Sequence, residues 1–179
     1  IAAVTHFAQN PSASNVTNLV GDIPAIHGGT EEVLAHEPDL ILAGRFTHSE
    51  TVRFLKQIGY EVVVIPVPQN FSEIRENIRV VAEAVGEKQK GEAMIAKLNR
   101  DLEELSIGTV PERGLSLERP KIIFYQVRGY SAGLNTFENA IIQAAGGENL
   151  TASLGIEGHG LIPLEAVSYT HLTLPTRLP

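Results

Sequence analysis

Short apolar runs and helix-like segments alternate along the first half of the chain. The apolar runs are rich in β-branched residues, lack polar alternation, and occupy residues 1–5, 39–44 and 61–67. Such runs are typical of strands that are covered on both faces. The segments between them have helical spacing and span residues 30–37 and 48–59. In the second of these, Thr47 with Glu50 predicts a capping box and Gly59 predicts a C-cap. Strands that alternate with helices predict a parallel α/β sheet, so we assign residues 1–71 to an N-terminal lobe.

The pattern changes at Ser72, where apolar residues begin to recur at helical spacing. The spacing continues to about residue 107 with one break, at Gly86. We therefore predict a helix pair over residues 72–107. Its second helix is about 20 residues, or about 30 Å, long.

A second α/β segment follows a connection rich in proline and glycine. It contains a predicted strand at residues 121–127, a glycine-rich loop and a helix at residues 136–147 that Thr136 caps. The predicted fold is therefore α/β, with two Rossmann-like lobes that have parallel sheets and are joined by a single long backbone helix. We assign residues 108–167 to the C-terminal lobe. Residues 168–179 show no helical or strand period, and we interpret them as a non-native tail.

Composition excludes several classes of chemistry. The chain has 179 residues, of which 43% are hydrophobic, enough for one good core or two small ones. A formal net charge of −7 argues against a nucleic-acid surface. No apolar stretch approaches the roughly eighteen residues of a membrane span. Cysteine is absent, which excludes disulfides, thiolate metal sites and cysteine catalysis.

The sequence GYSAG at residues 129–133 fits the G-x-S-x-G pattern of a serine-hydrolase nucleophile elbow. In an elbow the helix begins directly after the serine, whereas the next predicted helix begins only at Thr136. A set of Ser131, Glu157 and His159 would also place all three residues on adjacent loops. A hydrolase that uses Ser131 is the alternative from another functional class, and it requires Ser131 within hydrogen-bond reach of His159. We favour a loop that lines a ligand cleft at the carboxyl end of a strand.

Two histidines, His6 and His48, follow predicted strands, and a third, His159, lies in a glycine-rich loop. Three imidazoles that converge on a cleft beside a carboxylate would suit zinc or manganese. No local spacing matches a metal motif. A free zinc or manganese receptor is therefore the alternative among binding proteins, and it predicts that the three side chains converge.

Aromatic and arginine side chains stand near the carboxyl ends of strands in both lobes, at Arg45, Phe46, Arg128 and Tyr130. Stacking and charge-assisted hydrogen bonds from such residues suit a bulky ligand that is anionic or chelates a metal. Two glutamates, Glu31 and Glu165, each begin a short predicted helix after a glycine-containing loop, where the helix dipole favours a carboxylate. Their equivalent positions in the two lobes make them candidate contacts for a partner.

Three segments together resemble the class III periplasmic binding proteins of iron-siderophore, haem and cobalamin ABC importers. They are ILAGRFTHSETVRFLKQIGYEV (residues 41–62), FSEIRENIRVVAEAVGEKQKGEAMIAKLN (71–99) and AGGENLTASLGIEGHGLIPLEAV (145–167). The resemblance runs from Ile1 to about Val167. It implies two α/β lobes joined by one long helix, no enzymatic activity and no cofactor.

The resemblance also implies a function. The chain would be the extracytoplasmic substrate-binding component of an ABC importer for a metal chelate: a ferric siderophore, cobalamin or haem. It would capture the chelate between its lobes and deliver it to the permease, in the periplasm or anchored to the membrane. Glu31 and Glu165 match the glutamates that dock on permease arginines, and Arg45, Phe46, Arg128 and Tyr130 match positions at the cleft edge.

Two departures from the family pattern concern the ends of the chain. Family members usually begin with an earlier strand and helix, and they continue after the position of Glu165 with a helix and a further strand. We therefore expect a fragment that is truncated at both ends and has an incomplete second lobe.

Overall fold

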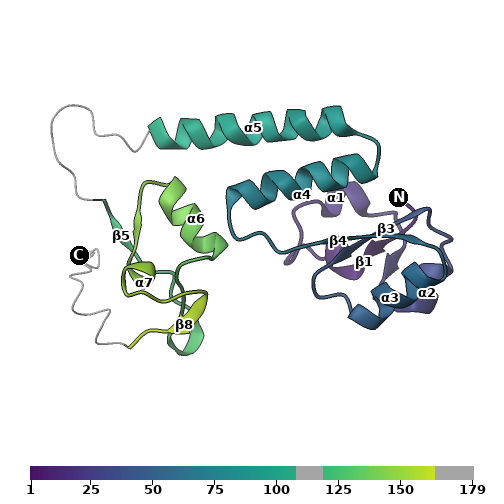
Figure 1. Cartoon of the computed structure of the whole chain (residues 1–179), viewed down its shortest axis with the longest axis horizontal. Helices are drawn as coiled ribbons and strands as arrows, with labels where there is room; N and C mark the ends of the chain where they lie inside the picture. The colour runs from purple at the N-terminus through teal and green to yellow at the C-terminus, as the bar shows by residue number, and fades with distance from the viewer. Residues whose placement is uncertain (108–118, 164–179) are drawn as a thin grey trace. The chain divides into compact units, whose positions relative to one another are not determined.

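The computed structural model describes residues 1–107 and 119–163, which form two compact units (Figure 1). The first unit consists of residues 1–67 and 80–87. The second consists of residues 68–79 and the described residues from Lys88 onward. The residues of the predicted tail, and Glu165, lie outside the described part of the chain.

Parallel strand pairs organise the first unit. Its elements are β1 (Val4–Thr5), the 3-10 helix η1 (His6–Gln9), α1 (Thr17–Val20), β2 (Ala25–Ile26), α2 (Thr30–Leu34), β3 (Leu40–Gly44), α3 (Ser49–Gln57) and β4 (Glu61–Ile65). β1 pairs with β2, and β3 pairs with β4, both in parallel. The predicted strands at residues 39–44 and 61–67 are confirmed. The predicted capping box is wrong, because α3 begins at Ser49 after His48 and no side chain caps it.

The core of the first unit lies between the β3–β4 pair and the helices α2 and α3. Ala43, Leu55 and Val62 are buried together, and Leu55 is only 2% exposed. Val33 of α2 and Val52 of α3 pack against this cluster. The helical period of residues 48–59 thus places one apolar face of α3 on the sheet.

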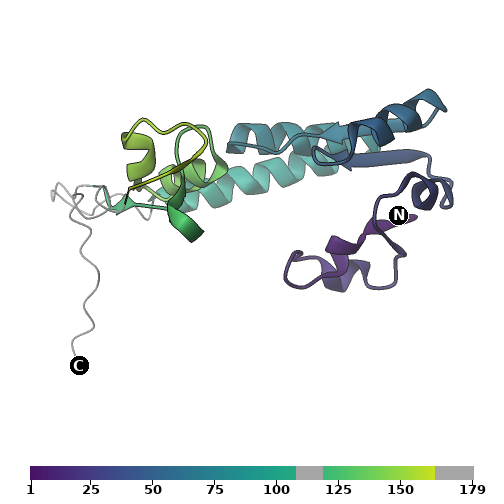
Figure 2. The ribbon, with the colours of Figure 1, turned by 90° about the horizontal axis from the view of Figure 1, so that it is seen from below.

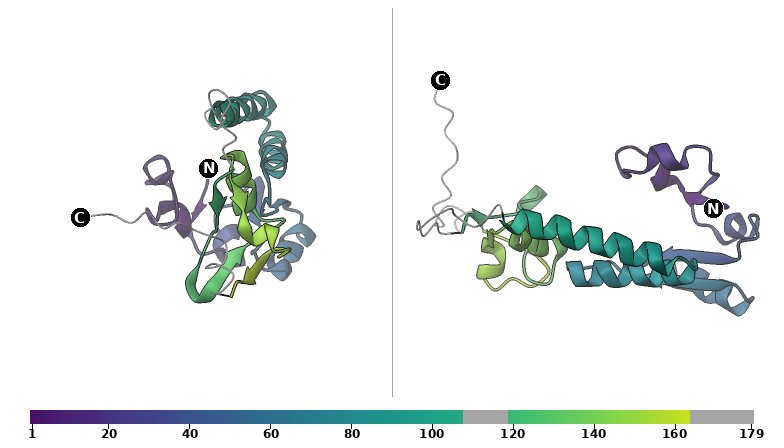
Figure 3. Two further views of the ribbon diagram at one scale, coloured as in Figure 1. Left: turned by 90° about the vertical axis from the view of Figure 1, so that its left-hand side faces the viewer. Right: turned by 90° about the horizontal axis from the view of Figure 1, so that it is seen from above.

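Helices α4 (Phe71–Ala84) and α5 (Lys88–Ile107) lie side by side (Figures 2 and 3). The chain reverses at Gly86, whose φ of 73° lies in the left-handed region that glycine adopts without steric cost. Among the contacts between the helices, Arg75 Nε donates to Asn99 Oδ1 at 2.7 Å, and Arg79 Nε lies 2.8 Å from Glu92 Oε1. The predicted helix pair with a break at Gly86 is confirmed.

Charged residues recur along α5, and none of the helices that the structure describes is long and apolar enough to cross a membrane.

The second unit contains α4 and α5 residues and a small α/β segment. The segment consists of β5 (Lys121–Ile122), η2 (Val127–Gly129), β6 (Tyr130–Ala132), α6 (Phe137–Ala144), β7 (Glu148–Asn149), α7 (Leu150–Ser153) and β8 (His159–Leu161). β5 and β7 are parallel, whereas β6 and β8 are antiparallel. The predicted strand at residues 121–127 is shorter than expected, because β5 ends at Ile122. The α/β class with parallel strand pairs and one long helix is confirmed.

Candidate functional site

The carboxyl ends of β1 and β2 bring three ring-bearing side chains together. The parallel register pairs Thr5 with Ile26, so the next residues on the two strands, His6 and His27, become neighbours. Their imidazole rings stack with centroids 4.6 Å apart and planes tilted by 24°. The ring of Phe7 lies 3.9 Å from that of His6, and Phe7 is 59% exposed. We call His6, Phe7 and His27 the ring shelf.

Stacking determines what the ring shelf can bind. The ring-nitrogen lone pairs lie in the ring planes, so two stacked imidazoles do not converge as metal ligands. They cover each other's facing sides, and the exposed ring surface of the shelf comes from Phe7 and His27. The shelf therefore suits contact with a flat or apolar ligand. His6 Nδ1 is buried and has no hydrogen-bond partner in the described residues, a cost of about 1–3 kcal/mol where such a group stays unpaired.

The metal-receptor alternative finds no support in this geometry. Within residues 1–107 and 119–163, no three His, Asp or Glu side chains are placed to hold a metal ion. His48 precedes α3, and His159 lies on β8 with its Nε2 atom 3.3 Å from Glu138 Oε1. His27, which the sequence analysis did not select, is the residue that pairs with His6.

Glu31 and Glu32 are neighbours in the first turn of α2, but their carboxylates have different surroundings. Glu32 Oε2 accepts hydrogen bonds from the backbone N–H groups of His27, at 2.9 Å, and Gly29, at 3.2 Å. The Gly29 and His27 N–H groups lower the pKa of Glu32 below its usual value. Glu31 is exposed, and its carboxylate has no hydrogen-bond or ion-pair partner among the described residues. Glu32 thus caps the helix and leaves Glu31 available for an external contact.

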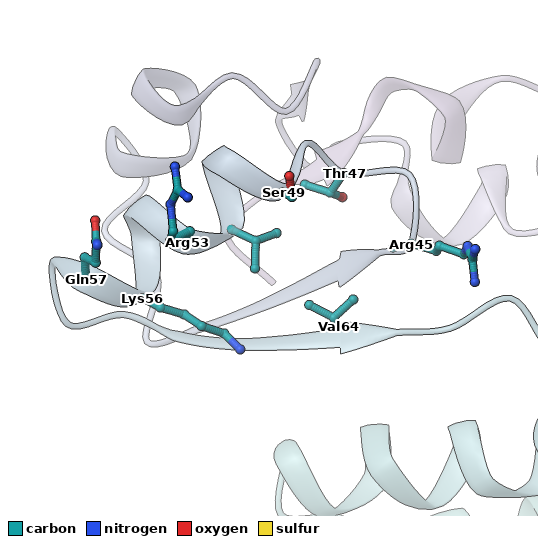
Figure 4. Close-up of a pocket in the computed structure, with 9 residues that line it drawn as sticks. Arg45, Thr47, Ser49, Arg53, Lys56, Gln57 and Val64 are labelled. Atoms are coloured by element: carbon teal, nitrogen blue, oxygen red, sulfur yellow. The ribbon is translucent and has the colours of Figure 1, made fainter.

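Arg45 and Phe46 directly follow β3, as predicted, and Phe46 is 86% exposed. Beside them a groove of about 550 Å³ opens between α3 and the β3–β4 pair (Figure 4). Figure 4 shows Lys56 reaching from α3 toward β4 and Val64 pointing from β4 toward the helix. We call this cavity the α3 groove.

In the second unit a tight turn presents Arg128 and Tyr130. Arg128 and Gly129 have φ values of 65° and 81°, both in the left-handed region. The turn is closed by two hydrogen bonds, from Gln126 N–H to Tyr130 O at 2.7 Å and from Gly129 N–H to Gln126 O at 3.2 Å. Tyr130 is 46% exposed, and a non-glycine residue at positive φ such as Arg128 is uncommon enough to suggest a functional constraint.

Ser131 does not fit a hydrolase. It lies within β6 rather than at a strand-to-helix turn, and it is 1% exposed. Its hydroxyl shares a 2.6 Å hydrogen bond with Thr151 Oγ1 rather than with His159. The nucleophile hypothesis is therefore wrong. Because side chains alternate along a strand, the inward Ser131 directs Tyr130 to the opposite, exposed face.

Comparison with known proteins gives a consistent picture. A family profile described as periplasmic binding protein matches residues 1–171. The chain is 30% identical over 144 residues to a protein named cobalamin-binding protein from Halobacterium salinarum, and the match covers 80% of this chain and 38% of that protein. It is 25% identical over 159 residues to the uncharacterized ABC transporter substrate-binding lipoprotein YvrC of Bacillus subtilis, which covers 85% of this chain and 49% of the relative. The chain therefore spans less than half the length of these curated relatives.

Solved structures show the same fold. The periplasmic heme-binding protein RhuT from Roseiflexus sp. RS-1 in apo form has a TM-score of 0.72 at 24% identity, with 93% of this chain and 63% of that chain covered. The periplasmic heme-binding protein HutB of Vibrio cholerae has a TM-score of 0.74 at 19% identity, with the same coverage of 93% and 63%. At these identities the likeness concerns the fold alone.

Proposed function

The chain belongs to the periplasmic binding protein family, and on this premise we propose that it is the substrate-binding component of an ABC importer for a metal chelate. The chelate class is a ferric siderophore, a corrinoid or haem. The names of the relatives support this class, since one is a cobalamin-binding protein and two structural neighbours are heme-binding proteins. An extracytoplasmic location, free or anchored by a lipid, follows from the same proposal.

The observation that carries the proposal is the ring shelf at the carboxyl ends of two parallel strands. Open α/β sheets bind ligands at these strand ends. The exposed rings of Phe7 and His27 offer apolar and aromatic surface to a macrocycle or to an aromatic chelating group. The turn at Arg128 and Tyr130 offers an aromatic ring and a guanidinium in the second unit.

We further propose that Glu31 docks on the permease together with Glu165. The free carboxylate of Glu31 supports this role, because exposed charges steer association and set register more than they add affinity. Charge reversal by Glu31→Lys should lower the rate of chelate uptake in cells and leave chelate affinity unchanged. A loss of affinity that equals the loss of uptake would contradict docking.

No reaction is required of the protein under this proposal. The ligand is captured, the binding-competent form gains population, and the permease receives the loaded protein. A ligand shifts such an equilibrium only by its differential affinity for the two forms.

The proposal is tested by a thermal-shift panel of haemin, cyanocobalamin, ferric siderophores and ferric citrate, with Zn²⁺ and Mn²⁺ as free-ion controls. A ligand at 100 times its dissociation constant adds about 2.7 kcal/mol of stability. We expect one chelate to raise Tm, and His27→Ala and Tyr130→Ala to weaken its binding. Met94→Ala, an exposed site on α5, is the matched control. No shift with any chelate, or a shift with the free ions alone, would refute the proposal.

A further inference from the structure

The α3 groove is lined by one stripe of its helix. Ser49, Val52, Arg53, Lys56 and Gln57 all line it, and their spacing of three, four, seven and eight residues places them on one side of α3. The strands supply the opposite wall. The groove is therefore built by regular elements of the first unit rather than by loops alone.

The lining of the groove is positively charged, whereas the chain as a whole is negatively charged. Acidic residues outnumber basic ones in the sequence by 21 to 14, yet the lining contains three basic residues, Arg45, Arg53 and Lys56, and no acidic residue. Arg45 and Lys56 have no ion-pair partner among the described residues. Arg53 pairs with Glu50 at 3.9 Å, but both side chains are exposed, so water and salt screen the pair. The positive charge of the groove thus remains available to an external anion.

The remaining lining is uncharged: it is apolar except for the hydroxyls of Thr47 and Ser49 and the amide of Gln57. Val52 of α3 and Val64 of β4 both line the groove, and Thr47 and Ser49 stand at the start of α3. Inorganic phosphate would leave the two valines uncovered, whereas an apolar chain without a charge would leave the cations unpaired. The volume of about 550 Å³ lies within the range of about 300–1,000 Å³ that is typical of small-molecule sites.

We propose that the α3 groove binds a small organic anion, with a carboxylate or phosphate headgroup against Lys56, with Arg53 adding positive charge at the rim, and with an apolar body along Val52 and Val64. Guanidinium and ammonium groups are the usual partners of such headgroups. The site goes beyond the proposed chelate function. It shares Arg45 with the cleft-edge positions, but its lining contains no residue of the ring shelf or of the turn at Arg128 and Tyr130, and the test below probes Arg53 and Lys56 instead.

The test is an NMR titration of the 179-residue chain with four probes: octanoate, octyl phosphate, octanol and inorganic phosphate. We expect octanoate or octyl phosphate to shift the backbone amides of Gly44, Thr47 and Val64 with saturation. Octanol and inorganic phosphate should bind at least about tenfold more weakly, since each satisfies only half of the lining.

Two double variants distinguish binding in the α3 groove from nonspecific attraction of the anion to positive charge elsewhere on the protein. Arg53→Gln/Lys56→Gln should weaken octanoate binding by about tenfold, as the loss of two exposed charge contacts predicts. The control Arg100→Gln/Lys121→Gln removes the same charges from exposed sites in the second unit and should leave affinity unchanged. Circular dichroism and Tm of both variants confirm folding. Equal losses in both variants, octanol binding as tightly as octanoate, shifts that map elsewhere, or no saturation with any anion would each overturn the proposal. Each of these results is independent of whether a chelate binds.

Discussion

The buried hydrogen bond between Ser131 and Thr151 predicts a strong coupling between the two side chains. Both residues are almost fully buried, and the 2.6 Å contact is the only side-chain partner recorded for either hydroxyl in the described residues. Ser131→Ala leaves the Thr151 hydroxyl without a partner inside the protein. Such an orphaned polar group costs about 1–3 kcal/mol. Thr151→Val orphans the Ser131 hydroxyl and should cost a similar amount.

The double variant should be more stable than the sum of the single changes predicts. It removes both polar groups together, and valine keeps the shape of threonine. We expect a coupling free energy of at least about 1 kcal/mol, which is about 2–4 °C in Tm for a chain of this size. Native-state hydrogen exchange of the β6 amides measures the change locally, and urea denaturation measures it globally.

The backbone of α7 is anchored beside this pair, which gives an internal control. Asn149 Oδ1 accepts from Thr151 N–H at 3.1 Å, and Asn149 Nδ2 donates to Ala132 O at 2.9 Å. These bonds keep the backbone in place in all three variants, so the cycle isolates the hydroxyl pair. Additive effects, or single variants that cost less than about 0.5 kcal/mol, would refute the reasoning.

Three further predictions follow from burial, close approach and capping. Leu55→Ala should cost about 2–5 kcal/mol in urea denaturation because it opens a cavity in the first core; a cost below about 1 kcal/mol would show that the core is not closed there. Gly133→Ala should destabilise by about 3 kcal/mol or more, since its Cβ would lie 2.0 Å from the carbonyl oxygen of Ile156. Gly44→Ala, with nothing within 4 Å of its Cβ, should stay within about 0.5 kcal/mol, and equal losses would contradict the packing. Glu32 has a folded pKa below 4.5, so its contribution to stability is present above the unfolded pKa and is lost as pH falls through the folded pKa. NMR titration of the amides it caps should give a midpoint below 4.5, and Glu32→Gln should abolish that titration; a midpoint at or above 4.5 would contradict the cap.

Local pattern predicted most of the elements. The helical spacing of apolar residues predicted α4 and α5, and Gly86 predicted the reversal between them. Both signals are local, because each depends only on residues that are close together in the sequence. Thr136 caps α6 as predicted, with its hydroxyl accepting from Asn139 N–H at 3.2 Å. The strand predicted at residues 121–127 failed beyond Ile122, because the bridge between Tyr125 and Ser131 and the turn at Arg128 take its place. Where these short strands begin and end also depends on their partners, β7 for β5 and β8 for β6, which come later in the sequence.

The candidate site was predictable only in part, for the same reason. The places of Arg45, Phe46, Arg128 and Tyr130 after a strand or in a glycine-rich turn could be predicted from local sequence, and their contact with a ligand stays a prediction. His27 could not be predicted as a site residue, because only the pairing of β1 with β2 brings its ring beside that of His6. The G-x-S-x-G pattern misled because a short motif does not state whether its serine lies in a turn or inside a strand.

The most direct test of the account is an absorbance titration of the protein with haemin, cyanocobalamin and ferric siderophores, all of which are coloured. The account predicts that one chelate binds with a stoichiometry of one per chain and that His27→Ala raises its Kd by about two- to tenfold, as the loss of one aromatic contact implies. Saturable binding that His27→Ala leaves unchanged would remove the ring shelf from the site. The absence of saturable binding by every chelate would contradict the proposed function itself.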